Sequence, residues 1–310
     1  MSEQKGGNKL AMIKSFVTAS PHEMDLTTAK GFVQDLLYRV KNVDMGGMGA
    51  QLAYFFLLSF FPLIIFLVTL LPYLNLKQEQ IFEFMENIIP GEVYSMVEGI
   101  LLEVLSGQNG GLLSIGILGT IWSASKGVDA LMKGLNRAYH VKGRPGFKNR
   151  LWSLIFTISL VGVILIALVF PVFGQQIGNI VASYLGIEAG LGPVWTFIRW
   201  ATPPLLILTV LWTMYWIVPN TDPRIKFFHA WPGAILATLG WLGLTYGFSF
   251  YINNFGNFSA TYGSIGGVII LMLWLYFTGM ILIFGGLVNA SLAQRKLALL
   301  RASNRKTVKF

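Results

Sequence analysis

The chain of 310 residues contains no cysteine and only three histidines. The absence of cysteine excludes disulfides and thiolate chemistry, and His22, His140 and His229 are too few and too scattered for a zinc site built from histidines. Charged residues make up only 12% of the chain, against about 25% in soluble domains. A soluble globule with so little charge could not cover its own surface. We therefore expect a membrane protein, with no bound metal and no cofactor.

Long stretches without Asp, Glu, Lys or Arg are the strongest pattern in the sequence. An ionised side chain at the bilayer centre is costly, and a spanning helix needs about 20 apolar residues. Four uncharged stretches are long enough for one span each, and a fifth, 227–294, is long enough for two, divided by the turn-forming residues 253–257. The sequence predicts an all-α, polytopic membrane protein with six transmembrane helices, at about 50–72, 108–126, 151–174, 201–219, 229–252 and 263–291.

The basic residues are distributed very unevenly between the two sides of such a six-span protein. All of the 23 Lys and Arg residues except Lys77 and Arg199 fall on the side that carries both termini. Short cytoplasmic loops are enriched in Lys and Arg, so both termini are predicted to be cytoplasmic in a multi-pass protein of the inner (cytoplasmic) membrane. The net charge of +9 then reflects topology and contact with anionic headgroups. We expect membrane lipids as partners, and no nucleic acid.

The segment before the first predicted span has the periodicity of an amphipathic helix. Between residues 28 and 42, apolar side chains recur every three or four positions, whereas Lys30, Arg39 and Lys41 occupy other faces. Such a helix lies along a membrane surface, here on the cytoplasmic side. The apolar positions are Phe32, Val33, Leu36, Leu37 and Val40.

The predicted spans divide the chain into three parts. Residues 1–44 form a cytoplasmic N-terminal tail with the amphipathic helix, 45–294 form the six-span membrane domain, and 295–310 form a basic cytoplasmic tail. The first external loop, 73–107, is acidic, and its apolar periodicity predicts two further interfacial helices.

The segment that follows the second predicted span carries the first set of candidate binding residues. Four charged positions are spaced i, i+3, i+7 and i+11, so a continuous helix places them on one face. They are Lys126, Asp129, Lys133 and Arg137. Asp129 can pair with both lysines, which leaves Arg137 free for an anion. Two interpretations stay open: an interfacial helix with local ion pairs, and a cytoplasmic site for phosphate or carboxylate headgroups.

Uncharged polar side chains within the spans form the second set of candidates. They could contact a headgroup along an intramembrane path while apolar helices tolerate acyl chains. They could equally form hydrogen bonds between helices. The residues are Gln51, Tyr54, Ser59, Ser123, Ser125, Tyr215, Asn253, Tyr262 and Asn289.

Proline and small residues within the spans bear on helix packing. Pro62 lies in the middle of the first span, where it removes a backbone hydrogen bond and is a candidate kink. In the fifth span, small residues recur three or four positions apart, which predicts close approach to a neighbouring helix. They are Gly233, Ala237, Gly240, Gly243 and Gly247.

Several short motifs together resemble the YihY / virulence factor BrkB family of membrane proteins, also filed as UPF0761. The resemblance covers roughly residues 30 to 295 with the motifs in the same order. The motifs are Gly49-Ala50-Gln51-Leu52-Ala53-Tyr54 with Leu58-Ser59-Phe60-Phe61-Pro62-Leu63, Ile121-Trp122-Ser123-Ala124-Ser125-Lys126-Gly127 with Leu135-Asn136-Arg137-Ala138-Tyr139, Ile217-Val218-Pro219-Asn220, and Tyr262-Gly263-Ser264-Ile265-Gly266-Gly267-Val268-Ile269.

The resemblance implies a six-span inner-membrane protein of a family formerly mislabelled as ribonuclease BN. Members have been linked to serum resistance, export and lipid transport. Where many members carry a glutamate in the last span, this chain has Leu287, which cannot carry a proton. Independently of the family, metal-assisted cleavage of RNA needs clustered His, Asp and Glu ligands, which the spans lack. We therefore expect no ribonuclease activity, no catalytic residues and no enzyme.

Two classes of function remain. The first is a transporter or lipid translocase for an amphipathic or anionic substrate. The second is a non-transporting scaffold of an envelope-assembly complex, for which we would expect a protein partner in the envelope or a homo-oligomer.

Overall fold

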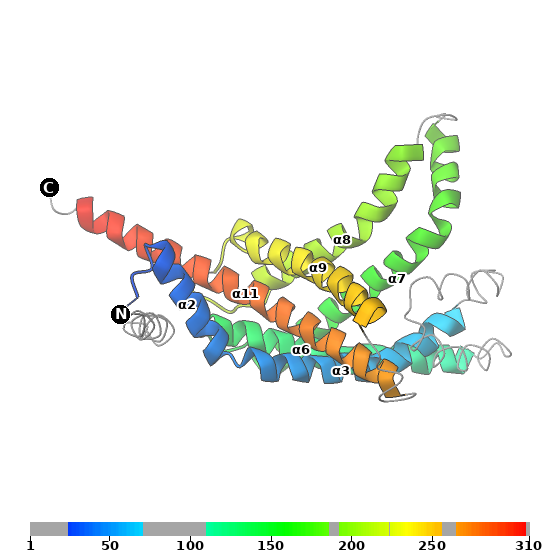
Figure 1. Cartoon of the computed structure of the whole chain (residues 1–310), viewed down its shortest axis with the longest axis horizontal. Helices are drawn as coiled ribbons and strands as arrows, with labels where there is room; N and C mark the ends of the chain where they lie inside the picture. Colours follow the sequence, from blue (N-terminus) through cyan, green and yellow to red (C-terminus); the bar gives the residue numbers. More distant parts are fainter. Residues whose placement is uncertain (1–23, 71–109, 186–191, 223, 256–264, 308–310) are drawn as a thin grey trace, which may run out of the picture.

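The computed structural model describes residues 24–70, 110–185, 192–222, 224–255 and 265–307 (Figure 1). Every regular element in these ranges is helical, which confirms the predicted all-α fold class. The predicted external loop and its two helices lie outside the described residues. The elements are α2 (Ala29–Asn42), α3 (Met45–Leu70), α6 (Gly110–Ala138), α7 (Gly146–Leu185), α8 (Gly192–Ile217), η2 (Phe227–His229), α9 (Trp231–Phe255) and α11 (Gly266–Thr307).

The six longest helices pack in a ring and alternate in direction (Figure 1). α3 contacts α6, α6 contacts α7, α7 contacts α8, α8 contacts α9, α9 contacts α11, and α11 closes the ring on α3. α2 packs against α11. We call the end of the ring where α3, α7 and α9 begin the basic end, because most of the described Lys and Arg residues lie at or near it.

Five helices are long and apolar enough to cross a membrane, namely α3, α7, α8, α9 and α11. The remaining ring helix, α6, contains the predicted span 108–126 from Gly110 onward and carries four charged residues between Lys126 and Arg137. The chain is therefore a polytopic helical membrane protein. Six as the number of spans stays a prediction, with which the place of α6 between α3 and α7 agrees.

Several helices extend beyond the predicted spans. α3 begins at Met45 rather than near 50, α7 continues to Leu185 rather than 174, and α11 continues to Thr307 rather than 291. The residues added at the start of α3 and at the end of α7 are uncharged, so these helices are longer than the roughly 20 residues that a span needs, whereas α11 continues past its span into charged residues from Arg295 on. α11 consequently includes most of the segment predicted as a basic tail.

The amphipathic helix predicted at 28–42 is confirmed as α2, with the Thr28 hydroxyl accepting a hydrogen bond from the Gly31 amide at 3.0 Å. The face that α2 turns toward the bundle is partly polar. The polar side chains of Asp35 and Arg39 are buried against the bundle, whereas the apolar Val33 and Leu37 are 42% and 39% exposed. The polar face is buried because it finds partners on α6 and α11, described below.

The buried core lies in the half of the ring nearest the basic end. Large side chains that are completely buried there come from α3, α6, α8 and α11, and they include Leu52, Leu131, Leu135, Tyr215 and Ile283. Toward the other end the helices bury much less. In the apolar 18-residue stretches of α8 and α9 that could cross a membrane, 6% and 11% of the residues are buried within the protein.

Small residues allow α9 and α11 to approach closely near the basic end. A Cβ atom added to Gly233 would lie 2.1 Å from the carbonyl oxygen of Gly285, and one added to Gly240 would lie 3.2 Å from Ile281. The predicted close approach is confirmed at these positions. It is wrong for Gly243 and Gly247, where an added Cβ would meet no described atom within 4 Å. The two helices therefore separate toward the far end.

α3 continues as a helix through Pro62, whose ring packs against α6. A Cβ atom added to Gly119 would lie 3.3 Å from Pro62 Cβ, so glycine makes room for the proline. In Figure 1 the light blue end of α3 departs from the line of its dark blue beginning. This bend agrees with the predicted kink in the first span.

Candidate functional site

The charged face of α6 begins with an ion pair. Lys133 Nζ lies 2.8 Å from Asp129 Oδ2, as the i, i+4 spacing predicts. Asn149 of α7 donates a further hydrogen bond to Asp129. One helical turn beyond Lys133, Arg137 is exposed, and its guanidinium has no hydrogen bond or ion pair within the described ranges. Arg137 is therefore available to an anion at the basic end.

The predicted pairing of Asp129 with Lys126 is wrong. Lys126 instead places Nζ 5.8 Å from the ring centroid of Trp122, one turn earlier in α6. Side chains on a helix lean toward its N-terminus, so each lysine reaches the residue four positions before it. Lys133 thereby reaches Asp129, and Lys126 reaches Trp122, whose ring face attracts the cation. Lys126 thus points along α6 away from the basic end.

Two of the sequence motifs, 135–139 and 217–220, meet at the basic end. The Asn136 side chain accepts a hydrogen bond from the Asn220 amide at 3.3 Å, which joins the end of α6 to the loop after α8. Arg144 donates hydrogen bonds to the carbonyl oxygens of Ile217 and Val218. These carbonyls have no partner within α8, because they lie at its C-terminal end. A cation there is also favoured by the helix dipole.

Arg39, which the sequence places off the apolar face of α2, is a buried connection between three helices. Its Nε lies 2.8 Å from Asp35 Oδ2, and both side chains are almost completely buried. The guanidinium also donates hydrogen bonds to the carbonyl oxygen of Ala138 and to the Gln294 side chain. Arg39 therefore ties α2 to the end of α6 and to α11. The i, i+4 spacing of Asp35 and Arg39 is the sequence signal that could have indicated the pair.

The turn after α6 is held by His140, which adopts a left-handed backbone conformation with φ of 54°. This conformation lets the Val141 amide donate to the Asn136 carbonyl at 3.0 Å, as at many helix ends. Burial lowers the pKa of His140, and the charge of Arg39 lowers it further, while Asp35 acts in the opposite direction. The lowered pKa reduces the contribution of His140 to the positive charge of the basic end.

The polar residues predicted to line an intramembrane path do not converge in the described structure. Gln51 and Tyr54 are exposed on the outside of α3. Three buried serines, Ser59, Ser123 and Ser125, donate hydrogen bonds to carbonyls of their own helices. The Asn253 side chain and Tyr262 lie outside the described residues. The path itself stays a prediction.

Two members of that predicted path, Tyr215 and Asn289, join helices instead. The Tyr215 hydroxyl donates to the Leu282 carbonyl, from α8 to α11. Asn289 of α11 accepts from the Gly233 amide and donates to the Ala230 carbonyl, both at 2.8 Å, and so caps the beginning of α9. Leu287, two residues earlier, is completely buried in the apolar core.

Among the residues that the structure describes, no group of three His, Cys, Asp or Glu side chains could hold a metal ion. His229 Nε2 instead lies beside Lys296 Nζ, which links the start of α9 to α11. The third histidine, His22, lies outside the described ranges. The polar geometry of the basic end consists of backbone capping, ion pairs and exposed cations, among them Arg137 on the charged face of α6.

The ring of apolar helices with a basic end defines the class of protein, a multi-pass helical membrane protein. Residues 36–309 match the family described as virulence factor BrkB, and the chain belongs to that family. This result confirms the family resemblance of the sequence motifs.

Curated relatives agree with this assignment. A protein of Bacillus subtilis named putative ribonuclease-like protein YfkH is 43% identical over 86% of this chain and 96% of its own length. UPF0761 membrane proteins of Vibrio campbellii and Photobacterium profundum are 26% and 28% identical over 86% and 92% of this chain and 83% and 88% of their own lengths. No solved structure matches the chain.

Proposed function

We propose that the chain is a membrane transporter or lipid translocase, which moves an amphipathic or anionic substrate across the cytoplasmic membrane. The observation that carries this proposal is the uneven packing of the ring. Core side chains join all six helices near the basic end, whereas α8 and α9 bury little of their spanning segments. Helices fixed at one end and loosely packed beyond it can change their separation while the fold persists. A rigid scaffold has no need of this arrangement.

The charge of the basic end supports an anionic substrate. Arg137 is exposed and unpaired within the described structure, and Lys133, although paired with Asp129, keeps 63% of its side chain accessible. A basic residue near the membrane surface contributes about 1 kcal/mol to the attraction of anionic lipid. The same exposed cations would attract a soluble anion, so the assay below separates the two sources.

The ribonuclease-like name of the Bacillus relative is not carried over to this chain. Hydrolysis of a phosphodiester with metal ions needs several carboxylate or imidazole ligands that converge. The described Asp129 is bonded to Lys133 and Asn149, and His229 lies beside Lys296. These contacts support a protein that is not an enzyme.

The proposed orientation places the basic end and both termini in the cytoplasm. The chain has no cysteine, so single-cysteine variants label at one site only. We expect Tyr184→Cys, at the far end of α7, to react with a membrane-impermeant maleimide on intact cells. Lys142→Cys, in the turn between α6 and α7, should react only after permeabilisation. The reverse pattern would show that the basic end faces outward.

Lipid translocation can be measured after reconstitution of the full chain into liposomes that contain headgroup-labelled phosphatidylglycerol. We expect label to cross the bilayer faster than in empty vesicles. Arg137→Ala should slow this movement about fivefold, which corresponds to the loss of about 1 kcal/mol of headgroup attraction. The rate at which an external quencher removes the label reports the movement.

Lys148→Ala is the matched control, because it removes one exposed positive charge from α7 without changing the α6 face. Its rate should fall less than that of Arg137→Ala, because Lys148 lies outside the α6 face that is proposed to contact the headgroup. Label that stays in its leaflet with folded native protein would refute lipid translocation. Uptake of a radiolabelled anion into the same vesicles would then identify a soluble substrate. A partner that co-purifies without flux of either kind would support the scaffold.

A further inference from the structure

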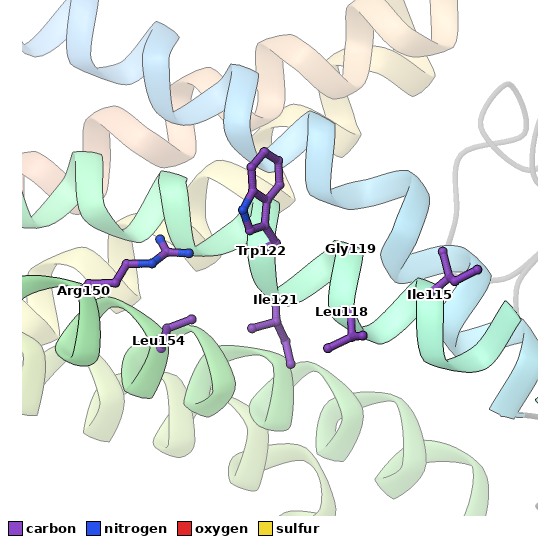
Figure 2. Close-up of a pocket in the computed structure, with 7 residues that line it drawn as sticks. All are labelled: Ile115, Leu118, Gly119, Ile121, Trp122, Arg150 and Leu154. Carbon is purple, nitrogen blue, oxygen red and sulfur yellow. The ribbon is translucent and has the colours of Figure 1, made fainter. Parts of the chain in front are cut away.

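An open groove of about 550 Å³ lies between α6 and α7 on the outside of the ring (Figure 2). Its walls are apolar along most of its length, and Arg150 is the charged residue among those that line it. The lining residues are Ile115, Leu118, Gly119, Ile121, Trp122, Arg150 and Leu154. The groove belongs to neither the Arg137 site nor the buried core.

The apolar part of the groove follows α6 toward the far end. Ile115 and Leu118 are 68% and 67% exposed, although they lie in the predicted second span. Seven residues separate Ile115 from Trp122, which amounts to about 10 Å along a helix. An exposed apolar channel within a bilayer fits part of a lipid acyl chain.

Positive charge is concentrated at one end of the groove. In Figure 2 the Arg150 side chain reaches from α7 toward α6 on the side of Trp122. Arg150 is half-buried, and no hydrogen bond or ion pair of its guanidinium occurs within the part of the chain that the structure describes. Lys126 adds a second charge from α6, with Nζ 5.8 Å from the Trp122 ring centroid. Asp129, the nearest acid along α6, is already bonded to Lys133 and Asn149.

Charge complementarity favours a lipid over a second copy of the chain. The six predicted spans contain no Asp or Glu, so a spanning helix of another copy would leave Arg150 without a counter-charge. A half-buried guanidinium group has lost part of its hydration, which costs free energy unless an anion compensates for it. A phosphate group supplies the missing charge, and Trp122 is of the residue type that lies at headgroup level in membranes.

We propose that the groove binds an anionic phospholipid, with an acyl chain along Ile115 and Leu118 and the phosphate on Arg150, with Lys126 beside it. The site holds its lipid at equilibrium, whether or not the protein moves lipid across the bilayer. The proposal therefore goes beyond translocation and can fail or hold independently of it.

Retention of lipid by the purified full chain tests the proposal. Delipidated protein in detergent is mixed with phosphatidylglycerol or phosphatidylcholine of the same acyl chains, and bound lipid is counted by native mass spectrometry. We expect the native chain to retain phosphatidylglycerol severalfold better. Arg150→Gln should lower that retention about tenfold, because a charge-assisted contact with phosphate is lost. Lys126→Gln should lower it less.

Two further variants distinguish the effect of the Arg150 charge from the effect of the shape of the apolar channel. Lys148→Gln removes the same charge two residues away on α7, where the side chain does not face the same direction, so retention should be unchanged. Leu118→Trp fills the apolar channel and should lower retention of both lipids. Equal loss in Lys148→Gln, equal retention of the two native lipids, or full retention in Arg150→Gln would each overturn the proposal.

A free phosphate or a second copy of the chain in the groove would give different experimental results. Glycerol phosphate at millimolar concentration should not displace the lipid, and displacement would show that a phosphate alone fills the site. Leu118→Cys should remain monomeric under oxidising conditions in native membranes, since the chain has no other cysteine. A disulfide-linked dimer would place a second copy over the groove and refute lipid as the occupant.

Discussion

Replacement of Arg39 by methionine is expected to destabilise the folded protein by about 3–5 kcal/mol, because it leaves Asp35 as a buried charge without a partner. The same change removes the hydrogen bonds that Arg39 donates to Ala138 and Gln294, so the end of α6 loses its connection to α2. Methionine keeps most of the volume of the side chain, which limits the contribution of a cavity. The measurement is thermal unfolding of purified protein in detergent, followed by circular dichroism.

The matched control for this prediction is Lys41→Met, two residues later in the same helix. Lys41 is exposed, so its replacement should change the melting temperature little. The double variant Asp35→Leu with Arg39→Met removes both charges and should recover part of the loss, since an apolar pair needs no counter-charge. A melting temperature of Arg39→Met equal to that of Lys41→Met would show that the buried ion pair does not hold α2 on the bundle.

The membrane helices could be predicted from the sequence because charge is excluded from hydrocarbon on energetic grounds alone. This exclusion acts on each helix separately, so it locates α3, α7, α8, α9 and α11 without knowledge of their neighbours. It does not fix where a helix ends. α7 continues through an uncharged stretch longer than one span needs, and α11 continues into charged residues, so the absence of charge predicts neither end.

The contacts of the candidate residues were predicted less well, because they depend on direction and on neighbouring helices. Spacing alone allows Asp129 to pair with either lysine, and the lean of helical side chains selects Lys133. The burial of Arg39 depends on a carbonyl 99 residues away in sequence, at Ala138. Within α2, only the i, i+4 spacing from Asp35 distinguishes this arginine from the exposed Lys41, and it does not reveal the partners on α6 and α11.

The groove between α6 and α7 also depends on neighbouring helices, so it could not be predicted from the sequence. Ile115, Leu118 and Trp122 resemble ordinary membrane-facing residues in the sequence, and Arg150 resembles one of many basic residues near a span. Only the packing of α6 beside α7 brings the apolar channel and the guanidinium together. Lys126, a candidate from sequence, contributes there through Trp122 rather than through Asp129.

Replacement of Gly233 by valine is expected to have the second large effect, through the contact of α9 with α11. The first added carbon atom would lie 2.1 Å from the Gly285 carbonyl oxygen and 2.5 Å from Asn289 Nδ2. The backbone cannot move aside as a flexible side chain could, so the helices must separate. Overpacking of this kind costs about 1–3 kcal/mol or more. Separation would also break the hydrogen bonds by which Asn289 caps α9. We expect a lower melting temperature and a smaller monodisperse fraction on size exclusion.

Gly247→Val is the matched control on the same helix. It introduces the same β-branched side chain, but an added Cβ at this position meets no described atom within 4 Å. Any cost of valine to helix formation is therefore common to both variants, and their difference measures the close approach near the basic end. The proposed transport depends on loose packing at the far end of the ring. The close contact between α9 and α11 must therefore be confined to the basic end. If Gly247→Val lowered the melting temperature as much as Gly233→Val, the far halves of α9 and α11 would be packed as tightly as the basic end. The helices could then not move apart there, which contradicts the proposed transport.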